Sequence, residues 1–205
     1  MAIRHAARLE AKGIARIITE ISAPFPMGSA ALTVVTFHSS RSIDDALKWE
    51  GSTLLLVSFL PLIHLLRQMR HGKVTDYHFR QREQRLPVFA VFLVSWLVAL
   101  LVLVWRGAPR ELVALIGAGV IALVVMGTIT AVWKISMHSG VVAGLTMVLA
   151  LLFGVRVFVF VPFIPAIGWS RVRLGDHTPP QVVAGMVIGA TVSGIAFTRI
   201  LALLH

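Results

Sequence analysis

Hydrophobic residues run in long blocks along this chain, and short polar stretches separate the blocks. A helix that crosses a bilayer needs roughly 20 apolar residues. Seven blocks reach or approach that length: residues 25–40, 51–66, 88–105, 111–132, 139–154, 157–169 and 182–204. The first and the sixth are short, and Pro162 and Pro165 interrupt the sixth. The pattern predicts an all-α, polytopic integral membrane helical bundle with six or seven transmembrane helices.

The stretch 139–169 admits two interpretations, one long helix or two short ones divided near Gly154. With two helices, the polar stretches 67–87, 133–138 and 170–181 all fall on the same side of the membrane. With one helix, the third stretch faces the opposite side. We favour two helices, because they gather most of the polar side chains that could do chemistry.

The first 24 residues have a different pattern. In residues 2–22, basic side chains recur every four residues and form one stripe on a helix, with apolar residues largely away from it: Arg4, Arg8, Lys12 and Arg16. This pattern predicts either a helix lying on a membrane surface or a solvated helix packed on the protein. We therefore divide the chain into an amphipathic interfacial N-terminal helix, residues 1–24, and a transmembrane domain, residues 25–205.

Composition supports the membrane assignment. Apolar residues make up 57% of the chain and charged residues 14%, against about 25% charged in soluble domains. The absence of cysteine excludes thiol catalysis and cysteine-ligated metal. The net charge of +10 fits basic cytoplasmic loops and anionic headgroups in a membrane protein, so nucleic acid is not an expected partner. Gly185 and Gly189 form a GxxxG pattern that predicts close helix packing.

The three polar stretches each combine basic with hydroxyl or amide side chains at a predicted membrane boundary. Arginine supplies forked hydrogen-bond donors and lysine a point charge, which suits a phosphate group. Two histidines in separate stretches, His138 and His177, could divide the roles of nucleophile and acid. A Mg²⁺ site formed by Asp76 and Asp176 is a further, weaker possibility.

The order and spacing of these residues resemble the type-2 phosphatidic acid phosphatase superfamily, which includes lipid phosphate and diphosphate phosphatases. Its third motif, S-R-x5-H-x3-D, is matched by Ser170-Arg171-x5-His177-x3-Gln181 except at the last residue. Its second, P-S-G-H, is matched at Ser136 and His138 alone. Its first, K-x6-R-P, has two possible registers: His78-x6-Arg85, with Pro87 one residue late, or Lys73-x6-Arg80, with no proline following.

The resemblance implies a function and a role for each residue. His177 would attack phosphorus to form a phosphohistidine, and His138 would protonate the leaving alcohol. The phosphoryl oxygens would be bound by a set of basic and hydroxyl residues: Arg85, Arg171, His78 or Lys73, Ser136 and the further candidate Arg82. No cofactor is implied. The expected substrate is a prenyl or glycerolipid phosphate or diphosphate, held among membrane lipids.

Gln181 stands where the family has an aspartate that orients the nucleophilic histidine. Its amide oxygen could hold the His177 tautomer, but it cannot stabilise a cationic imidazole as a carboxylate does. By analogy with a serine protease triad, the loss could reach ~10⁴-fold in rate. Two alternatives therefore stay open: a protein that binds or transports phosphorylated lipids without hydrolysis, and a prenyl-diphosphate-converting enzyme on the same scaffold.

The expected location is a plasma membrane of the bacterial type. With seven spans, thirteen Lys and Arg residues lie on the side of the motifs and six on the other, which by the positive-inside rule favours a cytoplasmic site. Omitting five candidate phosphate ligands leaves eight against six. Many bacterial members of the superfamily have the site on the outer face, so the resemblance points the other way. The oligomeric state is not predicted.

Overall fold

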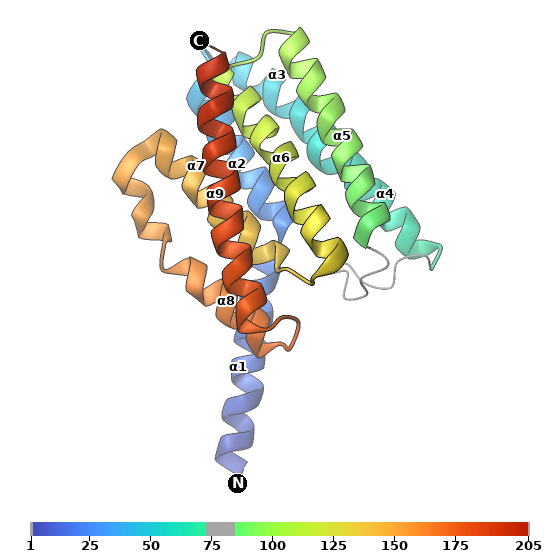
Figure 1. Ribbon diagram of the computed structural model, residues 1–205, viewed down its shortest axis with the longest axis vertical. Helices are drawn as coiled ribbons and strands as arrows, with labels where there is room; N and C mark the ends of the chain where they lie inside the picture. The colour runs from blue at the N-terminus through green and yellow to red at the C-terminus, as the bar shows by residue number, and fades with distance from the viewer. Residues whose placement is uncertain (1, 73–84, 205) are drawn as a thin grey trace.

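The computed structural model describes residues 2–72 and 85–204, with side chains from Glu10 to Gly72 and from Pro87 to Leu204. Every regular element in this part is helical. In chain order these are α1 (Ala2–Ile21), α2 (Pro24–Ser39), α3 (Ile43–Leu54), the π-helical turn η1 (Leu55–Phe59), α4 (Leu60–Arg70), α5 (Arg85–Trp105), α6 (Arg110–Val132), α7 (Met137–Phe153), the 3₁₀ segment η3 (Gly154–Phe160), α8 (Phe163–Arg173) and α9 (Pro179–Leu203). The prediction of an all-α bundle is confirmed (Figure 1).

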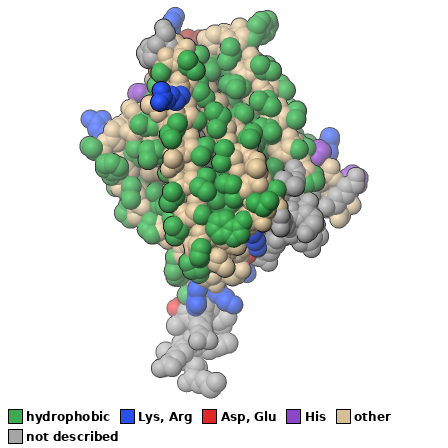
Figure 2. All heavy atoms as spheres, in the orientation of Figure 1, with side chains coloured by type: hydrophobic (Ala, Val, Ile, Leu, Met, Phe, Trp, Pro, Cys, Tyr) green, Lys and Arg blue, Asp and Glu red, His purple; other side chains and the backbone are tan. Residues whose placement is uncertain are grey.

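Five helical stretches in the described part are long and apolar enough to cross a membrane: Ile43–Arg70, Pro87–Trp105, Arg110–Val132, Met137–Phe160 and Pro179–Leu203. Hydrophobic side chains cover most of the face of the bundle that Figure 2 shows. Two expected segments fall short of this length. The helix α2 has 16 residues, which span about 24 Å against a hydrocarbon core of about 30 Å, and residues 157–169 are divided between η3 and α8. The protein is an integral membrane protein of helical-bundle type.

The chain turns back after α7, as the two-helix interpretation of residues 139–169 predicts. Gly154 ends α7 with a φ of 69°, a left-handed conformation that glycine adopts without steric cost. The segment η3 and the helix α8 then lead the chain back to the end of the bundle where α7 begins (Figure 1). The polar stretches 133–138 and 170–181 therefore meet at the same end.

The bundle is centred on α9, which packs against α7 and α6. The predicted GxxxG contact is present. A Cβ on Gly185 would lie 2.5 Å from the carbonyl oxygen of Ser136, and one on Gly189 would lie 2.1 Å from that of Gly140. The two helix backbones thus approach so closely that a side chain at either position would require them to move apart. This packing fixes the start of α7 against α9.

The helix α1 forms where the pattern predicts a helix and extends beyond the bundle along its long axis (Figure 1). Its C-terminal half packs on α8. Ala15 and Thr19 are buried there, while Lys12 and Arg16 are exposed. This half of the helix therefore matches the alternative of a helix packed on the protein. Contact of α1 with a membrane surface stays a prediction.

Candidate functional site

A cavity of about 230 Å³ lies inside the bundle, walled by α2, η1 and α4 to α9. Most of its lining side chains are hydrophobic. Three polar side chains from the predicted motifs also line it: His138, Arg171 and His177. Their exposed fractions are 6%, 2% and 8%. The fold thus brings the second and third motifs together at one cavity, where buried charge and hydrogen bonds act more strongly than in water.

The spacing of the third motif has a local structural cause. Arg171 lies in the last turn of α8, and Gly175 follows the helix with a φ of 75°. The Gly175 N–H donates to the Val172 carbonyl at 3.0 Å, and the Asp176 N–H donates to the Arg171 carbonyl at 3.1 Å. These two bonds form a Schellman motif, in which a left-handed glycine closes the helix. The His177 N–H also donates to the Arg171 carbonyl, at 3.3 Å, so the turn holds His177 beside Arg171.

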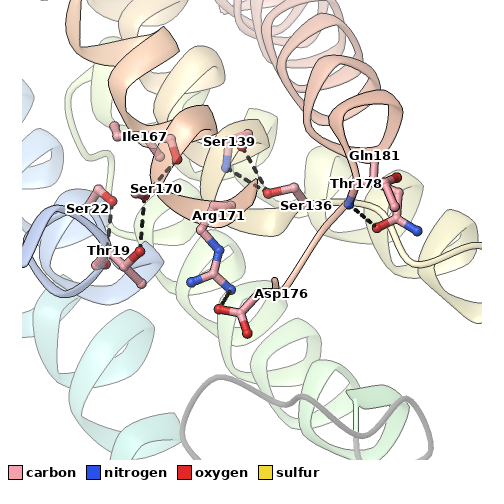
Figure 3. A network of polar contacts seen from close by, with 10 residues as sticks. All are labelled: Thr19, Ser22, Ser136, Ser139, Ile167, Ser170, Arg171, Asp176, Thr178 and Gln181. Carbon is pink, nitrogen blue, oxygen red and sulfur yellow. Dashed lines mark hydrogen bonds and ion pairs between the residues drawn. The ribbon is translucent and has the colours of Figure 1, made fainter. Parts of the chain in front are cut away.

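Asp176 is the partner of Arg171. One carboxylate oxygen, Oδ2, lies 3.1 Å from Nη2 of the guanidinium, and both side chains are buried (Figure 3). A buried guanidinium needs a counter-charge, because desolvating an isolated ion costs several kcal/mol. The contact between Asp176 and Arg171 was not predicted from the sequence, because it depends on the turn at Gly175. Gly175, shortly after a predicted helix, was the available signal for such a turn.

The second motif forms the N-terminus of α7. Ser136 is the N-cap, its Oγ lies 2.9 Å from Oγ of Ser139, and both residues are fully buried (Figure 3). His138 lies in the first turn of the helix. The amide groups and dipole of a helix N-terminus favour negative charge. The position of α7 therefore suits an anion held between His138 and Arg171.

Gln181 is used differently from our expectation. Its side-chain oxygen Oε1 accepts a hydrogen bond from the Thr178 N–H at 3.1 Å, as in a capping box at the start of α9 (Figure 3). The oxygen that we expected to orient His177 is thus engaged by its own helix cap. The Gln181 backbone carbonyl accepts from the Ser136 N–H at 3.2 Å, and this bond joins the second and third motifs through the main chain.

Ser170, the first residue of the third motif, is not among the residues that line the cavity. Its Oγ donates to the Ile167 carbonyl at 2.7 Å and lies 3.1 Å from Oγ1 of Thr19 on α1. Ser170 therefore anchors α1 on α8 (Figure 3).

Four basic candidates and one Mg²⁺ candidate lie outside the described residues: Lys73, His78, Arg80 and Arg82, and Asp76. Arg85 is the first residue of α5, and its side chain also lies outside them. The end of α4 and the start of α5 lie at the same end of the bundle as α8 (Figure 1). Of the two carboxylates proposed for Mg²⁺, the described one, Asp176, is paired with Arg171.

Comparison with known proteins gives one family. No curated protein and no solved structure matches the chain significantly. Residues 128–203 match the family model described as the PAP2 superfamily. The matched part runs from the end of α6 through α9 and contains His138, Arg171 and His177. The match supports the resemblance to the type-2 phosphatidic acid phosphatase superfamily over this part of the chain, which includes the two cavity-lining histidines.

Proposed function

We propose that the protein is a membrane phosphatase that removes phosphate from a lipid phosphate or diphosphate, of the prenyl or glycerolipid class. The observation that carries this proposal is the placement of His138, Arg171 and His177 in the wall of a mainly apolar cavity within a membrane bundle. Such a cavity accommodates a hydrocarbon chain, while the basic residues receive the headgroup.

The proposed reaction has two steps. A ring nitrogen of His177 attacks phosphorus, the phosphorus–oxygen bond to the lipid breaks, and His138 gives its proton to the leaving oxygen. A water molecule then attacks phosphorus, His138 takes a proton from that water, and the phosphorus–nitrogen bond breaks to release inorganic phosphate and free His177. Arg171, held by Asp176, binds the phosphoryl oxygens on which charge develops, together with the N-terminus of α7.

The first motif completes the proposed phosphate site. Arg85 and either His78 or Lys73 bind phosphoryl oxygens, with Arg82 as a further ligand. Ser136 supports the site chiefly by capping α7, since its Oγ is engaged with Ser139. Gln181 takes part indirectly, through its carbonyl bond to Ser136.

A second candidate is a protein that binds a phosphorylated lipid without cleaving it. The observation in its favour is the capping role of Gln181, whose amide stands where the family has an aspartate and accepts a hydrogen bond from the Thr178 N–H.

Phosphate release by the purified protein in detergent tests the proposal. The substrates are prenyl phosphates, prenyl diphosphates, phosphatidic acid and phosphatidylglycerol phosphate, with EDTA present. We expect release by the wild type and none by His177→Ala. The matched control is His38→Ala, because His38 is exposed at the other end of the bundle. Absence of release, together with thermal stabilisation by one of these lipids, would favour the second candidate. Release that EDTA abolishes would contradict the metal-free mechanism.

A further inference from the structure

The cavity extends from the polar end of the bundle towards its middle. On α7 the lining residues run from Met137 to Val148, a rise of about 17 Å at 1.5 Å per residue. The inner part of the wall includes Val57 of η1, Trp96 of α5 and Gly119 of α6, with Leu115 and Ile116 one turn further along α6. Trp96 packs there against the main hydrophobic core. An apolar chain whose phosphate lies at Arg171 would therefore point towards Trp96.

The indole of Trp96 is fixed on one side by η1. Its Nε1–H donates to the Val57 carbonyl at 3.0 Å, and the neighbouring Ser95 hydroxyl donates to the Leu56 carbonyl. Both carbonyls belong to the π-helical turn, a local change of winding of the kind that often marks functional sites. The half-buried indole N–H with this acceptor resists rotation, because turning the ring away would break the hydrogen bond.

The other side of the ring lies against the backbone of α6. A Cβ built on Gly119 would lie 2.0 Å from Cζ3 of Trp96 and 2.9 Å from Cε3. The ring thus occupies the space that any other residue at 119 would fill. Contacts with η1 and α6 together hold a large, rigid side chain in the cavity wall about halfway along the bundle.

We infer that Trp96 closes the inner end of the cavity and sets the length of the hydrocarbon chain that the site accepts. This inference rests on the proposed function and specifies its substrate: a lipid phosphate whose chain ends at Trp96. Each methylene group that enters an apolar cavity raises affinity about fourfold. Groups beyond the indole gain nothing, because the ring blocks further entry. The wild type therefore shows a chain-length optimum.

The test compares kcat/KM for geranyl, farnesyl and geranylgeranyl monophosphate in the wild type and in Trp96→Leu. We expect the ratio of the longest to the shortest substrate to rise about tenfold in Trp96→Leu. Trp96→Phe, with a smaller ring and no N–H donor, should change this ratio in the same direction by a smaller factor. Trp105→Leu is the control, because Trp105 is on the same helix but 85% exposed.

The outcomes separate this inference from the proposed function. Release of phosphate from geranyl monophosphate by the wild type supports the function, whatever the chain-length ratios are. An unchanged ratio in a folded Trp96→Leu protein overturns the role of Trp96 alone. If Trp96→Leu does not fold, an unchanged ratio in Trp96→Phe overturns the role of Trp96. Absence of release from all three substrates in the wild type overturns the inference, and the proposed function is overturned as well only if the wild type also releases no phosphate from the prenyl diphosphates and glycerolipid phosphates of the wider panel.

Discussion

At the scale of single residues, the buried pair Arg171–Asp176 is the dominant electrostatic feature of the site. Replacing Asp176 with Asn removes one negative charge from beside a guanidinium that is 2% exposed. We expect Asp176→Asn to lower the free energy of unfolding by about 3 kcal/mol. Thermal or denaturant unfolding in detergent measures this loss. Added orthophosphate or vanadate should raise the melting temperature of the variant more than that of the wild type, because a bound anion replaces the missing charge.

The matched control for this variant is Asp45→Asn. Asp45 is half-exposed and lies 4.0 Å from Lys48, so its replacement should change stability by only about 0.5 kcal/mol. An equal response of Asp176→Asn and the wild type to the added anions would show that Arg171 is not where they bind.

Gln181 allows its capping role to be separated from the expected role in orienting His177. If the Gln181 side chain only caps α9, Gln181→Ala should lose about 0.5–1 kcal/mol of stability. Its phosphate release should then stay within about threefold of the wild type. If the Gln181 side chain instead orients His177, the rate of phosphate release by Gln181→Ala could fall by up to ~10⁴-fold. We expect the first result, since Oε1 is bonded to the Thr178 N–H. Gln181→Glu, which retains the cap, should retain stability as well. Parallel measurement of unfolding and phosphate release distinguishes the two roles.

Motif spacing could predict which residues share the site but not what each side chain does there. His138, Arg171 and His177 line the cavity as the spacing indicated. Ser170 and Gln181 also occupy positions of the family's third motif. The Ser170 hydroxyl, however, contacts Thr19, and the Gln181 amide oxygen accepts from the Thr178 N–H in a helix cap. These contacts depend on neighbouring elements and on turn geometry, neither of which is contained in the spacing of a motif.

At the scale of elements, the turn after α8 positions His177 beside Arg171. Gly175 adopts a φ of 75°, and no atom lies within 4 Å of a Cβ built there. Gly175→Ala therefore adds left-handed strain of about 1 kcal/mol and no clash. We expect phosphate release to fall about tenfold or more, because relaxation of the turn shifts His177 relative to Arg171.

Gly107 provides a close control for this prediction. It connects α5 and α6 at the opposite end of the bundle, with a φ of 70° and equally open space. Gly107→Ala should lose similar stability and keep full activity. Equal losses of activity in both variants would mean that the turn at Gly175 does not position the site.

The hydrophobic blocks predicted the ends of most helices to within a few residues, because lipid-facing and core-facing positions are both apolar along a spanning helix. It could not predict η1. The sequence Leu55–Phe59 reads as ordinary apolar helix, and its π-helical winding accompanies the donors that Ser95 and Trp96 bring to its carbonyls. The break after α7 was foreseen, since Gly154, Pro162 and Pro165 mark it in the sequence.

At the scale of the whole molecule, the candidate site and the exposed basic residues of α1 lie at one end of the bundle, while the α2–α3 connection lies at the other (Figures 1 and 2). The positive-inside rule predicts that the end with the site faces the cytoplasm. The chain contains no cysteine, so single cysteines can report the orientation without background. Lys12 and Lys48, both exposed, mark the two ends.

We expect a membrane-impermeant maleimide to label Lys48→Cys in intact cells and to label Lys12→Cys only after the membrane is permeabilised. Detergent-solubilised protein, in which both cysteines should react, controls for intrinsic reactivity. The reverse pattern would place the site on the outer face, and the candidate phosphate ligands, rather than topology, would then account for the excess of basic residues at that end. Labelling of both cysteines in intact cells would contradict the placement of α1 and the α2–α3 connection on opposite sides of the membrane.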